Sequence, residues 1–146
     1  MLHTIDEIQV GDSYTEDLEF TPARTAQFLG LTGDAAGIHT VESFSRDKGF
    51  DKLVVYGFLV SVQFSRILGM QLPGENTVIG RIEMDFHAPV YVGDWVTYRA
   101  TVRRVIKPLG LVALDLDVRK RDGSLCVEGK TTCAFKRPAE PATAEA

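Results

Sequence analysis

The sequence has little cysteine and little histidine. Its two cysteines, Cys126 and Cys133, stand seven residues apart in what reads as one strand. That spacing predicts that they lie on opposite faces, too far apart to form a disulfide. The three histidines, His3, His39 and His87, are scattered and lack the spacing of metal ligands. We therefore expect neither a disulfide framework nor a metal, and no other cofactor.

Long apolar runs and excess positive charge are missing as well. No apolar stretch approaches the ~20 residues needed to span a bilayer, and the N-terminus lacks the basic-then-apolar pattern of a secretion signal. The formal net charge of −4 and the acidic pI of about 5.3 argue against a nucleic-acid-binding surface. We expect a cytoplasmic protein that binds neither membranes nor nucleic acid.

What is present is an ordinary globular composition. The 146 residues are 45% hydrophobic and 25% charged, a single-domain length that can bury a core unaided. From Arg137 onward the chain is rich in proline, alanine and glutamate, which predicts a disordered tail over residues 137–146. The domain is expected to span residues 1–136.

The first half of the chain predicts one short strand and several helices. Thr21 and Pro22 favour a helix start, a hydroxyl at the cap followed by proline, and the helix is expected to reach Leu29 or Leu31. Its inward-facing residues are expected to be Ala26, Phe28 and Leu29. The other elements predicted here are a strand over Tyr14–Phe20 and a helix over Val41–Lys48, with Phe44 as its main apolar anchor.

The longest apolar run covers Gly57–Met70. Its length favours a helix over a strand, and it is apolar on nearly every side, which predicts a buried helix. Segments of alternating apolar and polar residues follow it and predict a meander of four strands. These segments are Val78–His87, Val96–Arg103, Val112–Arg119 and Leu125–Phe135, the last two joined at Asp122-Gly123.

Strands with one apolar face need a cover, and the helix over Gly57–Met70 is the obvious one. A helix apolar on nearly every side implies that the sheet curves around it. The expected fold class is therefore α+β, a hot-dog fold in which an antiparallel sheet wraps around one long central helix. A single copy would leave sheet edges open, so a homodimer with a continuous sheet is expected.

The segment from Thr32 to Thr40 carries the chemistry. It places a carboxylate, Asp34, and an imidazole, His39, five residues apart among small residues. Gly33 and Gly37 permit backbone angles that other residues resist, so both side chains can turn toward one point, as an acid/base pair requires. The structural alternative is that Asp34 merely caps a helix or a turn.

In its motifs the chain resembles the MaoC-like family, which includes the (R)-specific enoyl-CoA hydratases. The resembling stretches are Gly33-Asp34-Ala35-Ala36-Gly37-Ile38-His39, Tyr56-Gly57-Phe58-Leu59, and Met84 to Asp94 with its Pro-Val-Tyr-Val-Gly-Asp ending. Two departures stand out. The family usually has asparagine and proline where this chain has Ala36 and Gly37, and often histidine in place of Tyr56. Asn-Pro would stiffen and brace the loop, which Ala-Gly does not.

The resemblance implies a hydro-lyase that adds water to a 2-enoyl thioester of CoA or acyl carrier protein, or removes it from a 3-hydroxyacyl thioester. Asp34 and His39 would be catalytic. The backbone N–H of Gly57 would bind the thioester oxyanion. Ser65 either lines the substrate site or only permits close packing. Two alternatives stay open, a hot-dog acyl-CoA thioesterase and a non-catalytic acyl-binding subunit. Basic residues that could contact CoA, or simply be solvated, are Arg81, Arg99, Arg103 and Arg104.

Overall fold

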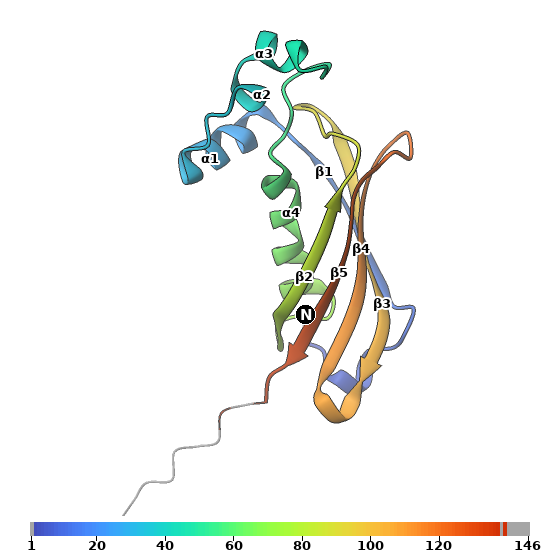
Figure 1. The fold of residues 1–146 in the computed structure, drawn as a ribbon. Helices are drawn as coiled ribbons and strands as arrows, with labels where there is room; N and C mark the ends of the chain where they lie inside the picture. The colour runs from blue at the N-terminus through green and yellow to red at the C-terminus, as the bar shows by residue number, and fades with distance from the viewer. Residues whose placement is uncertain (1, 138, 140–146) are drawn as a thin grey trace, which may run out of the picture.

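The computed structural model describes residues 2–137 and 139, so nearly all of the predicted tail lies outside the described residues. A five-stranded antiparallel sheet carries one helix along its face, and three short helices gather at one end (Figure 1). In chain order the elements are η1 (Ile5–Glu7), β1 (Ser13–Glu19), α1 (Pro22–Thr32), α2 (Gly37–Thr40), α3 (Glu42–Asp47), α4 (Gly57–Arg66), the π-helical η2 (Ile67–Gln71), β2 (Thr77–Phe86), β3 (Trp95–Ile106), η3 (Lys107–Leu109), β4 (Leu111–Lys120) and β5 (Leu125–Phe135).

The sheet has the strand order β1-β3-β4-β5-β2, with every neighbouring pair antiparallel. The predicted strands and the hairpin at Asp122-Gly123 are confirmed, and β5 has the bounds expected from the alternation. Strands β3, β4 and β5 occupy the middle of the sheet. Strands β1 and β2 form its edges. This is the α+β arrangement of sheet and helix that the patterns predict.

The core lies between the sheet and one side of α4 and η2. Val60, Phe64, Ile67 and Leu68 are buried against the inward residues of β3, β4 and β5. The hydroxyl of Tyr98 in β3 donates a hydrogen bond of 2.8 Å to the carbonyl of Val60. Burying the apolar side of α4 positions its first turn at the end of the sheet where the short helices gather (Figure 1).

The prediction that α4 is enclosed on nearly every side is wrong for the single chain. Phe58 is 82% exposed and Val62 54% exposed, because five strands cover only one side of the helix. The helix also ends at Arg66 and continues as the π-turn η2 to Gln71. An apolar stripe of α4 therefore faces outward beside the edge strand β2.

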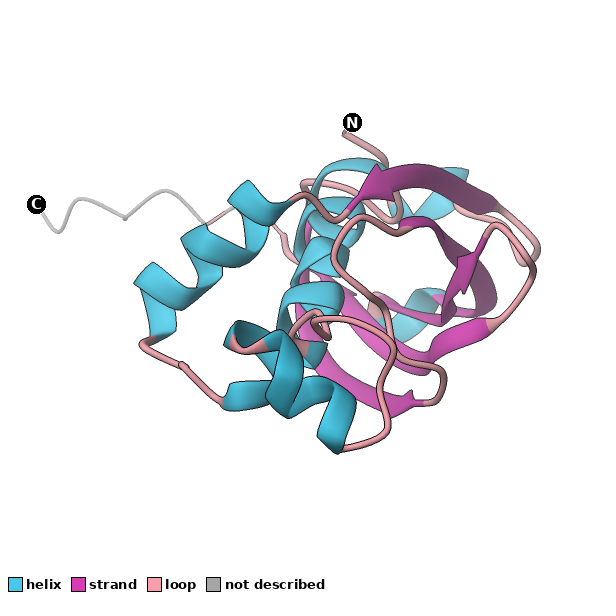
Figure 2. Ribbon diagram, turned by 90° about the horizontal axis from the view of Figure 1, so that it is seen from above, coloured by secondary structure: helices cyan, strands magenta, loops and turns pink. Residues whose placement is uncertain are grey.

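Two expectations about the short helices are also wrong. Helix α1 buries no residue, since it projects away from the sheet (Figure 2), so none of its predicted inward residues enters the core. Its start is as predicted, with the Thr21 side chain accepting from the N–H of Arg24. In α3 the buried residue is Ser45, whose hydroxyl donates to the Lys52 carbonyl at 2.7 Å, whereas Phe44 is half-exposed.

Both cysteines are free, as expected, and both are buried. They do not lie on opposite faces, because the pairing of β4 and β5 shifts by one residue at Cys126. Val118 pairs with Val127, and Arg119 pairs with Leu125. The bulge turns Cys126 into the core beside Val127 and so interrupts the alternation on which the prediction rested.

Candidate functional site

The loop that carries Asp34 begins where α1 ends. Gly33 closes the helix in the left-handed conformation, with φ of 72°, and donates its N–H to the Leu29 carbonyl at 2.8 Å. The exposed Asp34 carboxylate then accepts the N–H of Ala36 at 3.1 Å. The turn-capping interpretation of Asp34 is thus correct for one carboxylate oxygen. No described residue donates to the other.

Gly37, the first residue of α2, lies against the ring of Phe44. A Cβ at position 37 would lie 2.6 Å from Cδ1 of that ring and 2.7 Å from its Cγ. Proline is normally favoured at the first position of a helix. Here its Cβ would overlap the Phe44 ring, as the Cβ of alanine would. The glycine therefore makes room for Phe44, and its presence is not simply looseness of the loop.

His39 lies in α2 and is fixed by the extended segment before α4. Its Nδ1 is 2.6 Å from the carbonyl oxygen of Val54. Because a carbonyl only accepts, Nδ1 carries the proton, and in the neutral ring Nε2 keeps its lone pair. The N–H of Val54 donates in turn to the Ile38 carbonyl at 2.9 Å. The segment thus holds α2 by two bonds.

Tyr56, the residue before α4, links the two candidate catalytic residues. Its side chain is buried, and its hydroxyl donates to the backbone carbonyl of Asp34 at 2.7 Å. Its ring stacks on the His39 imidazole with 4.1 Å between centroids and 28° between planes. The Phe28 ring also packs against Tyr56, with 4.8 Å between the two ring centroids. Burial, and secondarily the charge of Asp34, raises the pKa of the Tyr56 phenol, so it remains a donor at neutral pH.

Two concavities meet at the site. A largely apolar groove of about 720 Å³ runs between α1, α4 and β2, and both Asp34 and Ser65 line it. A smaller cavity of about 290 Å³ is lined by His39 and Gly57. The ring of Phe86 borders both. The predicted residues therefore fall into two pairs, Asp34 with Ser65 in the groove and His39 with Gly57 in the cavity, and Phe86 is shared by both linings. No hydrogen bond joins Asp34 to His39.

The predicted oxyanion donor stands at the start of α4. Gly57 is the first helical residue, so its N–H has no partner within the helix, and no described residue accepts it. A Cβ at position 57 would lie 3.2 Å from the Phe86 ring, so this glycine allows the ring to approach. Ser61 donates its hydroxyl back to the Gly57 carbonyl at 3.0 Å, and both Ser61 and Ser65 line the groove.

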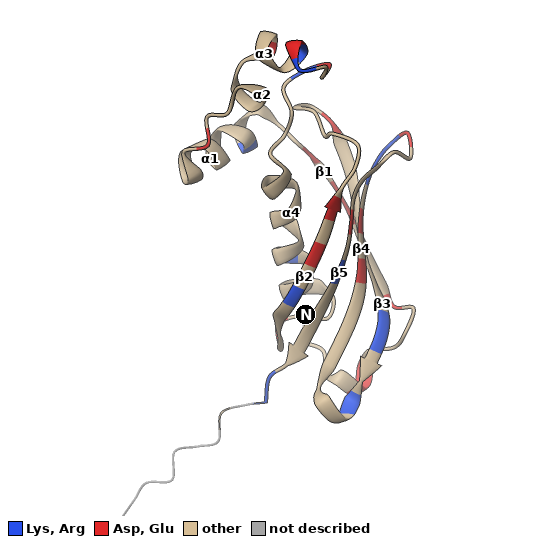
Figure 3. Cartoon of the chain, viewed as in Figure 1, with Lys and Arg blue, Asp and Glu red and all other residues tan. Residues whose placement is uncertain are grey.

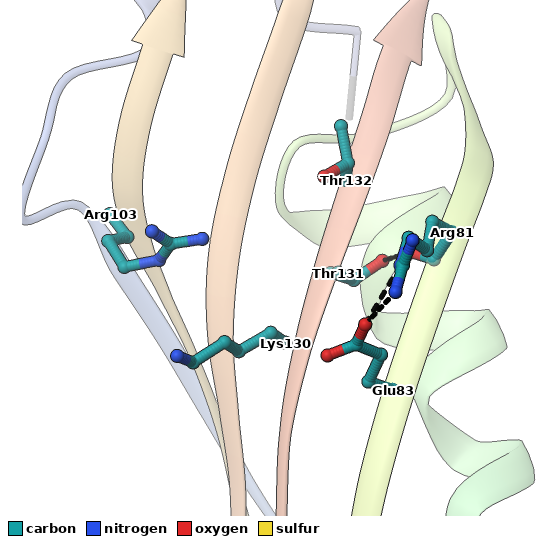
Figure 4. A pocket seen from close by; sticks show the side chains of 6 residues that line it. All are labelled: Arg81, Glu83, Arg103, Lys130, Thr131 and Thr132. Atoms are coloured by element: carbon teal, nitrogen blue, oxygen red, sulfur yellow. Dashed lines mark hydrogen bonds and ion pairs between the residues drawn. The ribbon is translucent and has the colours of Figure 1, made fainter.

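The basic residues lie away from this site. Charged residues occur along the strands, whereas α4 carries few of them (Figure 3). On the sheet face opposite α4, Arg81 pairs with Glu83 around a shallow pocket that Arg103 and Lys130 also line (Figure 4). Arg103 pairs in turn with Asp115 at 3.2 Å. Both arginines are exposed and pair with carboxylates, which fits the interpretation of solvated strand positions.

Sequence reasoning missed the part played by Tyr56 and Phe86. Tyr56 is visible in the sequence only as a departure from the family pattern, which says nothing of its hydrogen bond. Phe86 looks like any apolar residue of an alternating strand. Within the described residues no cluster of His, Cys, Asp or Glu could hold a metal, and no helix is long and apolar enough to cross a membrane.

Comparison with known proteins agrees with this architecture. Residues 7–110 match the MaoC like domain family. An (R)-specific enoyl-CoA hydratase from Aeromonas caviae is 29% identical over 123 residues, 84% of this chain and 92% of that one. A mitochondrial 3-hydroxyacyl-[acyl-carrier-protein] dehydratase from Solanum lycopersicum is 29% identical over 127 residues, covering 86% of this chain and 76% of that one. The structure of an (R)-hydratase from A. caviae involved in PHA biosynthesis superimposes with a TM-score of 0.84 at 28% identity, over 89% of this chain and 98% of that one. The chain has the hot-dog fold and belongs to the MaoC-like domain family.

Proposed function

We propose that the protein is a hydro-lyase that adds water across the C2–C3 double bond of a 2-enoyl thioester, or removes it in reverse. One observation carries the proposal. The bond from Nδ1 of His39 to the Val54 carbonyl leaves Nε2 available as a base, in a chain whose relatives are named for this chemistry. Asp34 supplies a carboxylate on the adjoining loop, which Tyr56 ties to the same position.

In the mechanism that fits these groups, a water molecule binds between the Asp34 carboxylate and Nε2 of His39. One group of the pair withdraws a proton from the water while the oxygen attacks C3. The electrons of the double bond move toward the thioester oxygen, where the N–H of Gly57 stabilises the developing charge. A proton from the pair then reaches C2. The sum is one water added, and dehydration follows the same steps backward.

The groove between α4 and β2 supports an acyl thioester as the substrate. Its lining is mainly apolar and includes Phe58, Ile82 and Met84, with Asp34 as the charged member. Ser65 is the polar group farther along the helix, where it would meet the acyl chain. The relatives are named for both CoA and acyl-carrier-protein thioesters, so either carrier fits the proposal.

We infer that two copies pair through the edge strand β2. That edge exposes Val78, Ile79 and Ile82, and the adjacent side of α4 exposes Phe58 and Val62. All of these except Val78 also line the groove, so a second copy would cover it. Edge strand β1, in contrast, has no large apolar side chain among the exposed ones. Exposed apolar edges invite pairing, so β2 is the edge that a second copy would extend. The cytoplasmic location stays a prediction.

The activity is tested by mixing the protein with short, branched and aromatic enoyl-CoA thioesters and following the loss of the conjugated thioester absorbance. Hydration without thiol release is the expected result. Release of free thiol would replace the proposal with a thioesterase. Tight binding measured by calorimetry with no turnover would replace it with an acyl-binding subunit.

The dimer is tested by sedimentation velocity on the wild type and on Ile82→Lys. We expect the wild type to sediment as a dimer and the variant, which places a charge on the β2 edge, to shift toward monomer. Arg99→Lys, an exposed change on β3 that keeps the charge, is the matched control. A wild type that stays monomeric at micromolar concentration would overturn the inference.

A further inference from the structure

The Asp34 loop has few side-chain bonds of its own. Its hydroxyl contacts are long, with Thr40 reaching the carbonyls of Ala35 and Ala36 at 3.2 Å each. Ala36 caps α2 without any side-chain hydrogen bond. The shortest hydrogen bond from outside to residues 33–36 of this loop comes from the Tyr56 hydroxyl, at 2.7 Å to the Asp34 carbonyl.

Tyr56 is itself well anchored. Its carbonyl accepts the N–H of Val60 at 3.0 Å as the first bond of α4, and the preceding Val55 donates to Val90 at 2.8 Å. The side chain is only 3% exposed, packed between Phe28 and the His39 ring. A buried side chain on a fixed helix start can transmit that rigidity to whatever it contacts.

Those contacts are the two candidate catalytic residues. The hydroxyl end of Tyr56 fixes the backbone of Asp34, and the face of its ring fixes the plane of the His39 imidazole. One side chain therefore sets the position of one residue relative to the other. This matters because the two side chains share no hydrogen bond. The other link between the two residues is the backbone of Ala36, whose N–H donates to the Asp34 carboxylate at 3.1 Å and whose carbonyl accepts the His39 N–H at 2.9 Å, and it does not touch the imidazole.

We propose that Tyr56 is a positioning residue that holds Asp34 and His39 in register, supplying the bracing that Ala36 and Gly37 do not provide. The proposal rests on the proposed function of the site. It assigns two separable roles to one side chain. The hydroxyl steadies the Asp34 loop, and the ring orients the imidazole.

Two substitutions separate these roles. Tyr56→Phe removes the hydroxyl and keeps the ring, and Tyr56→Leu removes both. Because displacement of a reacting group by about 1 Å costs on the order of a hundredfold in rate, we expect kcat to fall about tenfold in Tyr56→Phe and about a hundredfold in Tyr56→Leu. KM should stay within about twofold in Tyr56→Phe, which keeps the ring that packs against Phe28 at the wall of the groove.

Tyr98→Phe is the matched control. The Tyr98 hydroxyl also donates to a backbone carbonyl from a buried position, that of Val60 at 2.8 Å, but it contacts neither Asp34 nor His39. This variant should lose stability as Tyr56→Phe does while keeping kcat within about twofold. An equal loss of kcat in both variants would reduce Tyr56 to a general stabilising residue and overturn the proposal.

A second measurement does not depend on activity. In NMR experiments we expect the amides of residues 35–39 to exchange about fivefold faster in Tyr56→Phe than in the wild type or Tyr98→Phe. The His39 ring resonances should move in Tyr56→Leu, which loses the stacked ring, and stay in place in Tyr56→Phe. Unchanged exchange and unchanged resonances would overturn the positioning role. A wild type inert on every thioester, with the loop loosened as expected, would overturn the proposed function alone.

Discussion

The two candidate catalytic residues are held in very different ways. His39 is half-buried, bonded through Nδ1 to Val54 and stacked on Tyr56. Asp34 is exposed, and its carboxylate accepts one N–H, that of Ala36, which lies two residues further along the chain. The imidazole is therefore fixed by an element distant in sequence, whereas the carboxylate is fixed by its own loop.

The site therefore divides rigidity and access between its two candidate catalytic residues. A ring bonded at one nitrogen can turn little, so its other nitrogen points in one direction. A carboxylate on an exposed turn can move and can meet an incoming thioester in the groove. Substitutions at the two residues are therefore expected to differ in their effect on stability even where both abolish the same activity.

The largest effect is expected from removing the two functional groups themselves. Asp34→Asn and His39→Gln should each lower kcat for hydration about a thousandfold, because each removes a proton-transfer group. Only His39→Gln should also lower the free energy of unfolding, by about 1–2 kcal/mol, since glutamine leaves the Val54 carbonyl without its donor. Steady-state kinetics and urea unfolding of both variants measure this.

The side-chain amide introduced by Asp34→Asn can still accept the N–H of Ala36 through its oxygen, so this variant should unfold at the wild-type urea concentration. Equal losses of stability in the two variants would contradict the asymmetry between the two residues. Full activity in either variant would contradict its catalytic role.

The second prediction concerns the turn between the two residues. Gly37→Ala should lower the free energy of unfolding by about 1–3 kcal/mol, because the new methyl group overlaps the Phe44 ring. Calorimetric melting temperatures would show it. Gly30→Ala is the matched control. Apart from its chain neighbours and the backbone of its own helix, nothing lies within 4 Å of a Cβ at position 30, and alanine in a helix should stabilise by about 0.5–1 kcal/mol.

Phe44→Ala combined with Gly37→Ala should recover much of the loss, since the overlapping ring is gone. If Gly37→Ala is as stable as the wild type on its own, the ring moves freely and the glycine has no packing role. A proline at position 37, as in the family pattern, should behave like alanine here.

The strand pattern predicted the sheet well because alternation at period two reports directly on which residues face the core. The bounds of β5 and the turn at Asp122-Gly123 follow from it. The alternation failed at Cys126, where one extra residue in β5 changes the facing of its neighbours. It also could not say how much of α4 the sheet covers, because Phe58 and Phe64 are equally apolar in sequence and differ only in their position relative to the strands.

The sequence suggests which residues form the site, and their catalytic roles stay a prediction, but it does not indicate which contacts hold them. The spacing of Asp34 and His39 is local, so a short segment of sequence carries it. The bonds to Val54 and Tyr56 join residues 15 and 22 positions apart and depend on the fold. Gly37 shows the same limit, since what makes it necessary is the ring of Phe44, which no local pattern places against it.

The smallest effect is expected at the wall between the two concavities. A Cβ on Gly57 would stand 3.2 Å from the Phe86 ring, which must then move by a few tenths of an ångström. Gly57→Ala should therefore lower kcat/KM only about threefold to tenfold, well short of the loss expected for a displacement of about 1 Å. Phe86→Leu made together with Gly57→Ala should restore part of this loss, because the smaller side chain leaves room for the methyl group. Additive losses in the double variant would mean that the methyl group acts on the thioester itself. In that case the Gly57 side of the cavity faces the reacting carbonyl, and Phe86 has no part in separating the Asp34 groove from the His39 cavity.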